Sequence, residues 1–226
     1  MAERGRPRSF DREEALASAM EVFWVKGYEG ASISDLTQAM GIGSPSLYAA
    51  FGSKEALFHE AVEFYGRTEG PELWDVVGAA PTARQGVEGF LMATARVFTR
   101  EGKPRGCLVT LSALNTTPAS ASVCEAMRER RAVGQCGLEA RLKRAVAEGE
   151  LPPALDTGAV AAFYVTVQQG MSIQARDGAS RAALEQVAQA AMAAWEPLTR
   201  GYTRGTLPAC SQRVRASLRP KGPRIF

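Results

Sequence analysis

The sequence predicts an all-α fold. Almost every segment places its apolar residues at helical spacing, and no stretch of useful length shows the alternation of apolar and polar residues that a half-buried strand needs. The 226 residues are 46% hydrophobic and 23% charged, which is ordinary for a globular protein and excludes a mostly disordered chain. At roughly 150 residues per domain, this length corresponds to one or two domains.

The first predicted helix begins after Asp11. Asp11 is a favourable N-cap, and Glu14 three residues later completes the capping-box pattern. Lys26 lies in the last turn and Gly27 just beyond it, where a cation and a glycine both favour the end of a helix. The apolar residues between these ends form one stripe: Ala15, Leu16, Ala19, Met20 and Phe23.

Helix start and stop signals divide the rest of the chain. A residue that can cap a helix precedes most of the periodic segments, and Gly or Pro follows most of them. The expected N-caps include Ser32, Ser44, Ser53, Asp156 and Ser180. The expected helices after the first cover residues 33–40, 45 to about 50, 54 to about 66, 82–100, a short segment from 104 through 115, 120 to about 148, 159–176 and 182–195.

The last two predicted helices carry wide apolar faces. The first of them has Val160, Phe163, Tyr164, Val167 and Met171 on more than one stripe, and the second has Leu184, Val187, Ala188, Ala191, Met192 and Trp195 on an alanine-rich face. Both features are typical of a helix-pair dimer interface, in which two pairs form a four-helix bundle. We therefore expect a homodimer, and the alternative is that both helices only fill the core of one chain.

The net charge is +3, but the positive excess lies at one end of the chain. Residues 201–226 contain six basic residues and no acidic one, whereas residues 1–200 contain 21 basic and 24 acidic residues, a net charge of −3. We expect this basic tail to be disordered. The net charge therefore says nothing about what the folded part of the chain binds.

Targeting signals are not evident. The N-terminus is Arg-rich with no apolar stretch after it, so it does not resemble a secretory signal. No apolar run approaches the roughly 20 residues that cross a bilayer. We therefore expect a cytoplasmic protein with no membrane partner.

Residues 32–51 have the spacing of a helix-turn-helix. The residues 41–43, Gly-Ile-Gly, form the tight connection, and Pro45 stands at the start of the second helix, where its missing N–H costs nothing. At 1.5 Å per residue the second helix is about 9 Å long and fits a major groove about 12 Å wide. The expected core between the helices is Leu36, Met40, Ile42, Leu47 and Phe51, and the positions left to face outward are Ser44, Ser46, Tyr48 and Ala49.

Further spaced features surround this motif. They are Gly27-Tyr28-Glu29-Gly30-Ala31-Ser32-Ile33-Ser34-Asp35-Leu36, then Met40-Gly41-Ile42, Ser46-Leu47-Tyr48, Phe51 and Ser53-Lys54-Glu55-Ala56-Leu57-Phe58. Together they resemble the DNA-binding domain of the TetR family of transcriptional regulators over residues 10–60. Residues 60–200 resemble only the general plan of that family, although the segments 104–108 and 149–152 are similar to a common subgroup.

The resemblance implies a domain organisation. Residues 1–9 would be a basic flexible arm, 10–60 a three-helix DNA-binding head, 61–200 a larger helical domain for effector binding and dimerisation, and 201–226 the basic tail. The implied partners are double-stranded operator DNA, a second copy of the chain and a small-molecule effector.

The resemblance also implies contacts with DNA. The recognition helix corresponds to residues 44–50, with Tyr48, Lys54 and Ser32 as phosphate contacts. A lysine at a helix N-terminus opposes the helix dipole, so Lys54 is better explained if a phosphate joins it and the free amides. The alternative is a solvated surface lysine. The residues expected to contact DNA are Arg4, Arg6, Arg8, Ser32, Ser44, Pro45, Ser46, Tyr48, Ala49 and Lys54.

The predicted head is not net basic, which is unusual for a nucleic-acid-binding domain. Residues 1–54 contain six basic and seven acidic side chains. The exception is the arm at residues 4–8, with three arginines in five residues, which resembles arms that enter the minor groove. A disordered leader without a function is the alternative.

The effector would bind among aromatic and apolar residues of the second domain. Our expected lining consists of Trp74, Phe90, Met92, Phe98, Leu111, Tyr164, Gln168 and Met171, although each of these residues is also explained as core. His59 is the only histidine, and no catalytic triad can be assembled around it. We therefore expect no enzyme activity, no cofactor and no metal.

The four cysteines leave one alternative open. Cys107, Cys124, Cys136 and Cys210 have no CxxC spacing and no neighbouring histidines, so a zinc site is not expected. Buried free thiols are the simplest interpretation. A thiol redox sensor that uses Cys107, Cys124 or Cys136 is the alternative.

These observations predict a ligand-responsive transcriptional repressor that a small molecule releases from a palindromic operator. Two alternatives remain: the thiol redox sensor on the same scaffold, and a helical small-molecule-binding protein or enzyme with a vestigial DNA-binding head.

Overall fold

The structure is a computed structural model that describes residues 10–114 and 117–200. Within these residues the chain forms helices and connections and no strand, so the predicted all-α fold is confirmed. The helices are α1 (Arg12–Gly30), α2 (Ile33–Met40), α3 (Ser44–Phe51), α4 (Lys54–Thr68), α5 (Pro71–Ala79), α6 (Ala83–Phe98), α7 (Leu108–Leu111), α8 (Ala121–Ala147), α9 (Thr157–Arg176), α10 (Arg181–Ala193) and α11 (Trp195–Arg200), with a 3-10 turn η1 (Pro118–Ser120) before α8.

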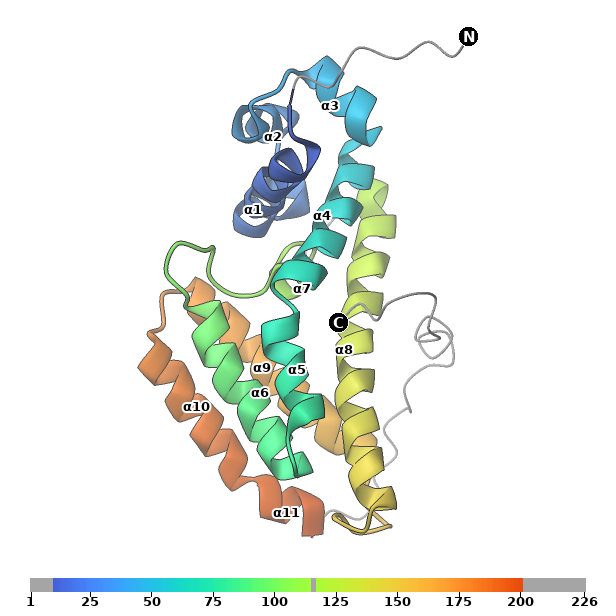
Figure 1. Cartoon of the computed structure of the whole chain (residues 1–226), viewed down its shortest axis with the longest axis vertical. Coiled ribbons are helices and arrows are strands. Elements are labelled where there is room, and N and C mark those ends of the chain that lie inside the picture. The colour runs from blue at the N-terminus through green and yellow to red at the C-terminus, as the bar shows by residue number, and fades with distance from the viewer. Residues whose placement is uncertain (1–9, 115–116, 201–226) are drawn as a thin grey trace.

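The helices divide into a head and a body (Figure 1). The head contains α1, α2 and α3, and α4 runs from it into the body beside the long helix α8. The predicted boundary at residue 60 falls inside α4, so one continuous helix joins the two parts. The predicted arm, residues 1–9, and the predicted tail, residues 201–226, lie outside the described residues. In the described part of the chain, no helix is long and apolar enough to cross a membrane.

Local capping explains most helix starts. The Oγ of Ser32 accepts a hydrogen bond from the Asp35 amide at 3.0 Å, and an Asp35 carboxylate oxygen accepts one from the Ser32 amide at 3.0 Å. The predicted caps Asp11, Ser53, Asp156 and Ser180 also accept hydrogen bonds from first-turn amides. The predicted cap at Ser44 is wrong, because Ser44 is already helical. Gly43 takes the extended cap conformation and has no side chain to accept a bond.

Three elements differ from the predicted pattern. Helix α5 was not predicted, since Gly70 before it offers no side-chain cap and only Leu73 and Val77 mark its buried stripe. The segment within 104–115 contains a single helical turn, α7. The final predicted helix is divided into α10 and α11 at Ala194. Its second part contains Pro197, which a helix tolerates only in its first turn.

The buried apolar residues form one continuous cluster that runs from Ala15 in the head to Trp195 in the body. Helices α6, α9 and α10 pack on one another in the body, and α8 lies along α9. Much of the wide apolar surface predicted for the last two helices is therefore core of a single chain, with Val160, Tyr164 and Leu184 fully enclosed. Part of this apolar surface stays uncovered, because Phe163, Val167 and Val187 are only partly buried and Ile173 is 47% exposed.

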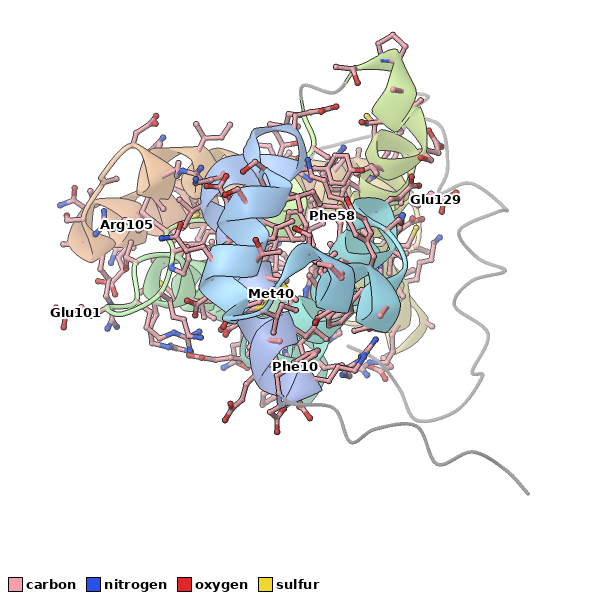
Figure 2. All side chains as sticks on the ribbon, turned by 90° about the horizontal axis from the view of Figure 1, so that it is seen from above. Phe10, Met40, Phe58, Glu101, Arg105 and Glu129 are labelled. Carbon is pink, nitrogen blue, oxygen red and sulfur yellow. The ribbon has the colours of Figure 1, made fainter. Side chains whose placement is uncertain are left out.

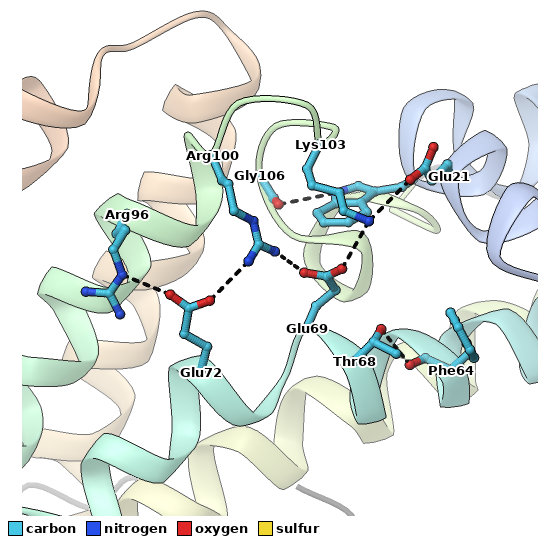
Figure 3. Close-up of polar contacts among 10 residues, drawn as sticks. Glu21, Phe64, Thr68, Glu69, Glu72, Arg96, Arg100, Lys103 and Gly106 are labelled. Carbon is cyan, nitrogen blue, oxygen red and sulfur yellow. Dashed lines mark hydrogen bonds and ion pairs between the residues drawn. The ribbon is translucent and has the colours of Figure 1, made fainter.

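A chain of ion pairs and hydrogen bonds holds the head on the body (Figure 3). Glu69, at the end of α4, pairs with Arg100 and, at 3.5 Å, with Lys103, which in turn pairs with Glu21 of α1 at 3.3 Å. Beside them the indole Nε1 of Trp24 donates to the Gly106 carbonyl at 3.2 Å. The orientation of α1 therefore depends on the segment that leads into α7.

The junction between head and body requires a glycine at position 106. Its φ is +80°, a conformation that other residues rarely adopt, and a Cβ there would lie 2.7 Å from the Ser172 carbonyl oxygen. Ser172 Oγ also accepts a hydrogen bond from the Cys107 amide at 2.8 Å. The backbone of 106–107 is thus packed directly onto α9.

Candidate nucleic-acid interface and internal cavity

The exposed face of α3 carries the residues that the sequence placed there. Ser44, Pro45, Tyr48 and Ala49 are exposed and Ser46 is half-buried, whereas Leu47 and Phe51 face the core. Tyr48 is one of the few large apolar side chains of the described chain that is about half exposed, at 47%. Figure 2 views the head from above, with Met40 and Phe58 among its helices. The geometry leaves one side of α3 free for a partner.

The turn between α2 and α3 sets the angle of that helix. Gly41 has a φ of +64°, and its amide and that of Ile42 donate to the last carbonyls of α2. Glycine adopts this left-handed conformation without strain. Helices α2 and α3 pack against each other across this turn. Leu36 of α2 and Leu47 of α3 are both fully buried.

The hydroxyl of Ser32 is engaged within the head. It donates to a carboxylate oxygen of Asp35 at 2.8 Å, and Lys26 binds the other oxygen of that carboxylate at 2.5 Å. The hydrogen bond from Lys26, and then those from Ser32, lower the pKa of Asp35 to about 2. Asp35 is therefore ionised at neutral pH. The predicted phosphate contact of Ser32 stays a prediction.

Three Lys or Arg residues lie in residues 10–60, and they differ in their partners. Arg12 forms an ion pair with Glu60 at 2.6 Å and stacks on the ring of Phe51, and Lys26 is paired with Asp35. Lys54 forms no salt bridge with any residue in the described ranges. It is thus the cation of the head that is available to an incoming anion.

Lys54 stands at the first position of α4, close to the free amides of that helix. Its ammonium lies 4.5 Å from the centroid of the Tyr28 ring, and partial burial lowers its pKa. Ser53 caps the helix by accepting from the Ala56 amide at 3.0 Å. A phosphate at this helix end would gain both the lysine and the dipole of α4. The predicted contacts at Arg4, Arg6 and Arg8 lie outside the described residues.

A cavity of about 140 Å³ lies in the body between α4, α5, α6, α7, α8 and α9. For comparison, a cavity of about 150 Å³ holds one benzene molecule. The walls of the cavity in this protein are mainly apolar. The lining residues are Tyr65, Gly66, Glu69, Gly70, Leu73, Trp74, Val97, Phe98, Cys107, Val109, Thr110, Arg130, Arg131, Val133, Gly134, Val165, Gln168 and Gln169.

Three of the eight residues predicted for the ligand site line this cavity: Trp74, Phe98 and Gln168. The other five, Phe90, Met92, Leu111, Tyr164 and Met171, are not among its lining residues, and their role in ligand binding stays a prediction. Phe90, Tyr164 and Met171 are fully buried, because they pack between helices on other sides of the body. The sequence could not separate these two roles, since lining and core residues share the same apolar types.

The charged groups that line the cavity already have polar partners. Glu69 pairs with Arg100 and Lys103, Arg130 pairs with Glu63, and Arg131 donates to the Val109 carbonyl at 3.1 Å. Gln168 differs, because it is only 6% exposed and its side chain has no hydrogen-bond partner in the described chain. A neutral ligand with one polar group therefore suits this cavity best.

The cysteines fall into different environments. Cys107 and Cys124 are free thiols, and Cys107 lines the cavity whereas Cys124 does not. Cys136 is disulfide-bonded, so the expectation of a free thiol is wrong there. A side-chain hydrogen bond joins Cys107 to Tyr65, and burial, followed by this neighbour, raises the pKa of the Tyr65 phenol well above its usual range. The sequence named Cys107 as a candidate for a thiol redox sensor, but no local signal placed it in the cavity.

The comparisons with known families agree with this division into head and body. The family described as "Bacterial regulatory proteins, tetR family" matches residues 15–61. The family described as "Tetracyclin repressor-like, C-terminal domain" matches residues 84–191.

Individual relatives match most of the chain. The HTH-type transcriptional repressor ComR of Escherichia coli (strain K12) is 34% identical over 198 residues, which cover 87% of this chain and 94% of that protein. The repressor BdcR of the same organism is 32% identical over 190 residues, which cover 84% of this chain and 90% of that protein. A solved structure of the TetR family regulator CifR, a cysteine mutant complexed with 26-bp double-strand operator DNA, is 48% identical with a TM-score of 0.82, and the match covers 84% of this chain and all of that one.

Proposed function

Because this chain belongs to the TetR family of bacterial transcriptional regulators, we propose that it is a repressor that binds a palindromic operator as a homodimer and leaves it when a small molecule fills the cavity. The observation that supports DNA binding best is that α3 has an exposed face and that Lys54, at the start of α4, has no salt-bridge partner in the described chain. We propose Ser44, Pro45, Ser46, Tyr48 and Ala49 as contacts in the major groove and Tyr48, Lys54 and Ser32 as contacts to phosphates, with Arg4, Arg6 and Arg8 as contacts in the minor groove.

Dimerisation is supported by the apolar surface that one chain leaves uncovered. Ile173 on α9 is 47% exposed, and Phe163, Val167 and Val187 are partly buried. Pairing α9 and α10 with a second copy would cover this surface in a four-helix bundle. A palindromic operator would then place two α3 helices about 34–36 Å apart in successive major grooves.

The effector we propose is compact, neutral and mostly apolar. The charges on the cavity wall already have partners, while Gln168 offers an unpaired amide. Binding can release DNA if the ligand prefers one head orientation over the other, since differential affinity is all that a population shift requires. We propose no catalytic activity, and a cytoplasmic location, because an operator-binding protein has to reach the chromosome.

The experiment that tests this function measures binding to the DNA upstream of the chain's own coding gene. We expect fluorescence anisotropy with a labelled duplex to give nanomolar to sub-nanomolar affinity, with at least about a thousandfold weaker binding to a scrambled duplex of equal length. Footprinting should protect two half-sites about one helical turn apart. Equal affinity for both duplexes would contradict operator recognition. An effector library that never alters the affinity would contradict the ligand switch.

A thiol-based sensor is the second candidate, and the position of Cys107 in the cavity wall favours it. We expect iodoacetamide to alkylate this sulfur, which displaces iodide and releases the thiol proton, and to lower operator affinity in the wild type. The variant Cys107→Ser should keep its affinity under the same treatment. Cys124→Ser serves as the matched control, because Cys124 is free but outside the cavity. An equal loss in wild type and Cys107→Ser would exclude this candidate.

A further inference from the structure

Two carboxylates are neighbours of Lys54, Glu29 in space and Glu55 in sequence, yet neither forms a salt bridge with it in the described chain. Glu29, at the end of α1, is close enough to act electrostatically on Lys54, and Glu55 is the next residue in α4. Both also act on the phenol of Tyr28, whose ring lies under the lysine. Carboxylates that pair with Lys54 would compete with a DNA phosphate for it. The direction in which Glu29 and Glu55 point therefore affects DNA binding.

The partners of both carboxylates come from one segment, residues 117–122, which leads into α8. An oxygen of Glu29 accepts hydrogen bonds from the Thr117 amide at 3.0 Å and the Thr117 hydroxyl at 3.1 Å, and the Ser120 hydroxyl bonds the same side chain. The Ser122 hydroxyl donates to Glu55 at 2.7 Å. These bonds, led by the one from the Thr117 amide, lower the pKa of Glu29.

These donors are neutral, which distinguishes them from the partners of the other head carboxylates. Asp35 pairs with Lys26, and Glu60 pairs with Arg12, so each of these carboxylates offsets the charge of one basic residue. Glu29 and Glu55 are bound by amide and hydroxyl groups instead, and neither forms a salt bridge with Lys54 in the described chain. His59 Nε2 also lies 3.7 Å from a carboxylate oxygen of Glu55.

We propose that residues 117–122 act as a positioning segment for DNA binding: their amide and hydroxyl donors hold Glu29 and Glu55 away from Lys54 and so keep this lysine free for a DNA phosphate. Without those donors the two carboxylates are free to pair with Lys54, which has no salt-bridge partner in the described chain and on which Glu29 already acts electrostatically. This inference rests on the proposed operator binding. The segment follows α7 in sequence, and α7 carries the cavity residues Val109 and Thr110.

A purely mechanical role for the segment makes a different prediction. If the hydrogen bonds only fasten the head to the body, then breaking them from either side has the same effect. If they restrain the carboxylates, then removing the donors and removing the carboxylates have different effects. The two sides of these bonds can therefore be tested separately.

The experiment measures operator affinity and its salt dependence for three variants. For Thr117→Val/Ser120→Ala/Ser122→Ala we expect affinity to fall about five- to tenfold, and the slope of log K against log salt to become shallower by up to about 0.9, the value of one phosphate contact. For Glu29→Ala/Glu55→Ala we expect no loss. Combining all five substitutions should restore the affinity and slope of Glu29→Ala/Glu55→Ala.

Matched controls separate this effect from general charge. Glu13→Ala/Glu14→Ala removes two exposed carboxylates from the first turn of α1, and it should not rescue the donor variant. In a Lys54→Met background the donor substitutions should have no further effect. Circular dichroism and melting of each variant check folding. If the triple variant does not fold, the exposed pair Ser122→Ala and Glu55→Ala carries the same comparison.

Equal losses in the donor and carboxylate variants would overturn the inference and leave only a mechanical role. A donor variant with wild-type affinity and slope would overturn it as well. A wild-type protein that binds no operator would instead contradict the proposed function, so the two failures are distinguishable.

Discussion

Replacing Lys54 with methionine is expected to weaken operator binding about ten- to hundredfold, because a hydrogen bond to a charged group contributes about 1.5–3 kcal/mol. Lys54 is the cation of residues 10–60 that has no salt-bridge partner in the described chain, so its loss is not compensated by the release of a carboxylate. A phosphate contact carries no sequence information. The variant should therefore lose affinity for operator and scrambled DNA alike.

The measurement is a salt series for each variant. The slope of log K against log salt should become shallower by about 0.9 for Lys54→Met, since one phosphate contact is lost. Tyr48→Ala should also weaken binding at all sequences, because Tyr48 is 47% exposed and its hydroxyl is the group that would reach a phosphate. Lys26→Met is the matched control, since Lys26 is already paired with Asp35. An unchanged slope in Lys54→Met would contradict a contact between this lysine and a phosphate.

Replacing Phe58 with alanine is expected to lower the free energy of unfolding by about 3–5 kcal/mol, the usual cost of emptying a buried aromatic site. Phe58 is fully buried on α4, and its ring meets those of Phe23 at 5.0 Å and Tyr28 at 5.1 Å, both on α1. These three rings fasten α1 to α4. The loss should therefore also weaken operator binding, since α2 and α3 are oriented by this contact.

Urea unfolding at fixed protein concentration measures the change, because the stability of a dimer depends on concentration. Phe58→Leu retains much of the volume and should cost less than Phe58→Ala. Val25→Ala is the surface control, since Val25 is 52% exposed and its truncation should change stability by less than about 0.5 kcal/mol. If Phe58→Ala unfolds at the same urea concentration as Val25→Ala, the aromatic cluster does not hold the head together.

Several features of this fold could be predicted because they depend on residues close in sequence. The capping box of Ser32 and Asp35 joins positions three apart, and the helical stripe of α1 repeats within a few turns. The outward face of α3 follows from the burial of Leu47 and Phe51 on its other side. The start of α3 was misplaced by one residue, because Ser44 has the chemistry of a cap but Gly43 has the backbone conformation.

The sequence could not place the cavity, because its walls come from six helices that are distant in sequence. Cys107 meets Tyr65 and lies near Gln168, and no spacing rule brings these three together. The type of residue did not help either, since Phe90 and Phe98 are both buried aromatics of α6 but only Phe98 lines the cavity.

The sequence by itself determined the all-α fold class, the order of the helices in the head and the surface that α3 offers, because periodicity, capping and turn chemistry act over a few residues. Only the tertiary structure decided which lysine of the head is unpaired. Arg12 is neutralised by Glu60, 48 residues away, and the carboxylates beside Lys54 are held by donors 67 and 88 residues away. Charge pairing depends on distance in space, so the binding competence of Lys54 follows from packing between distant segments and cannot be read from local pattern.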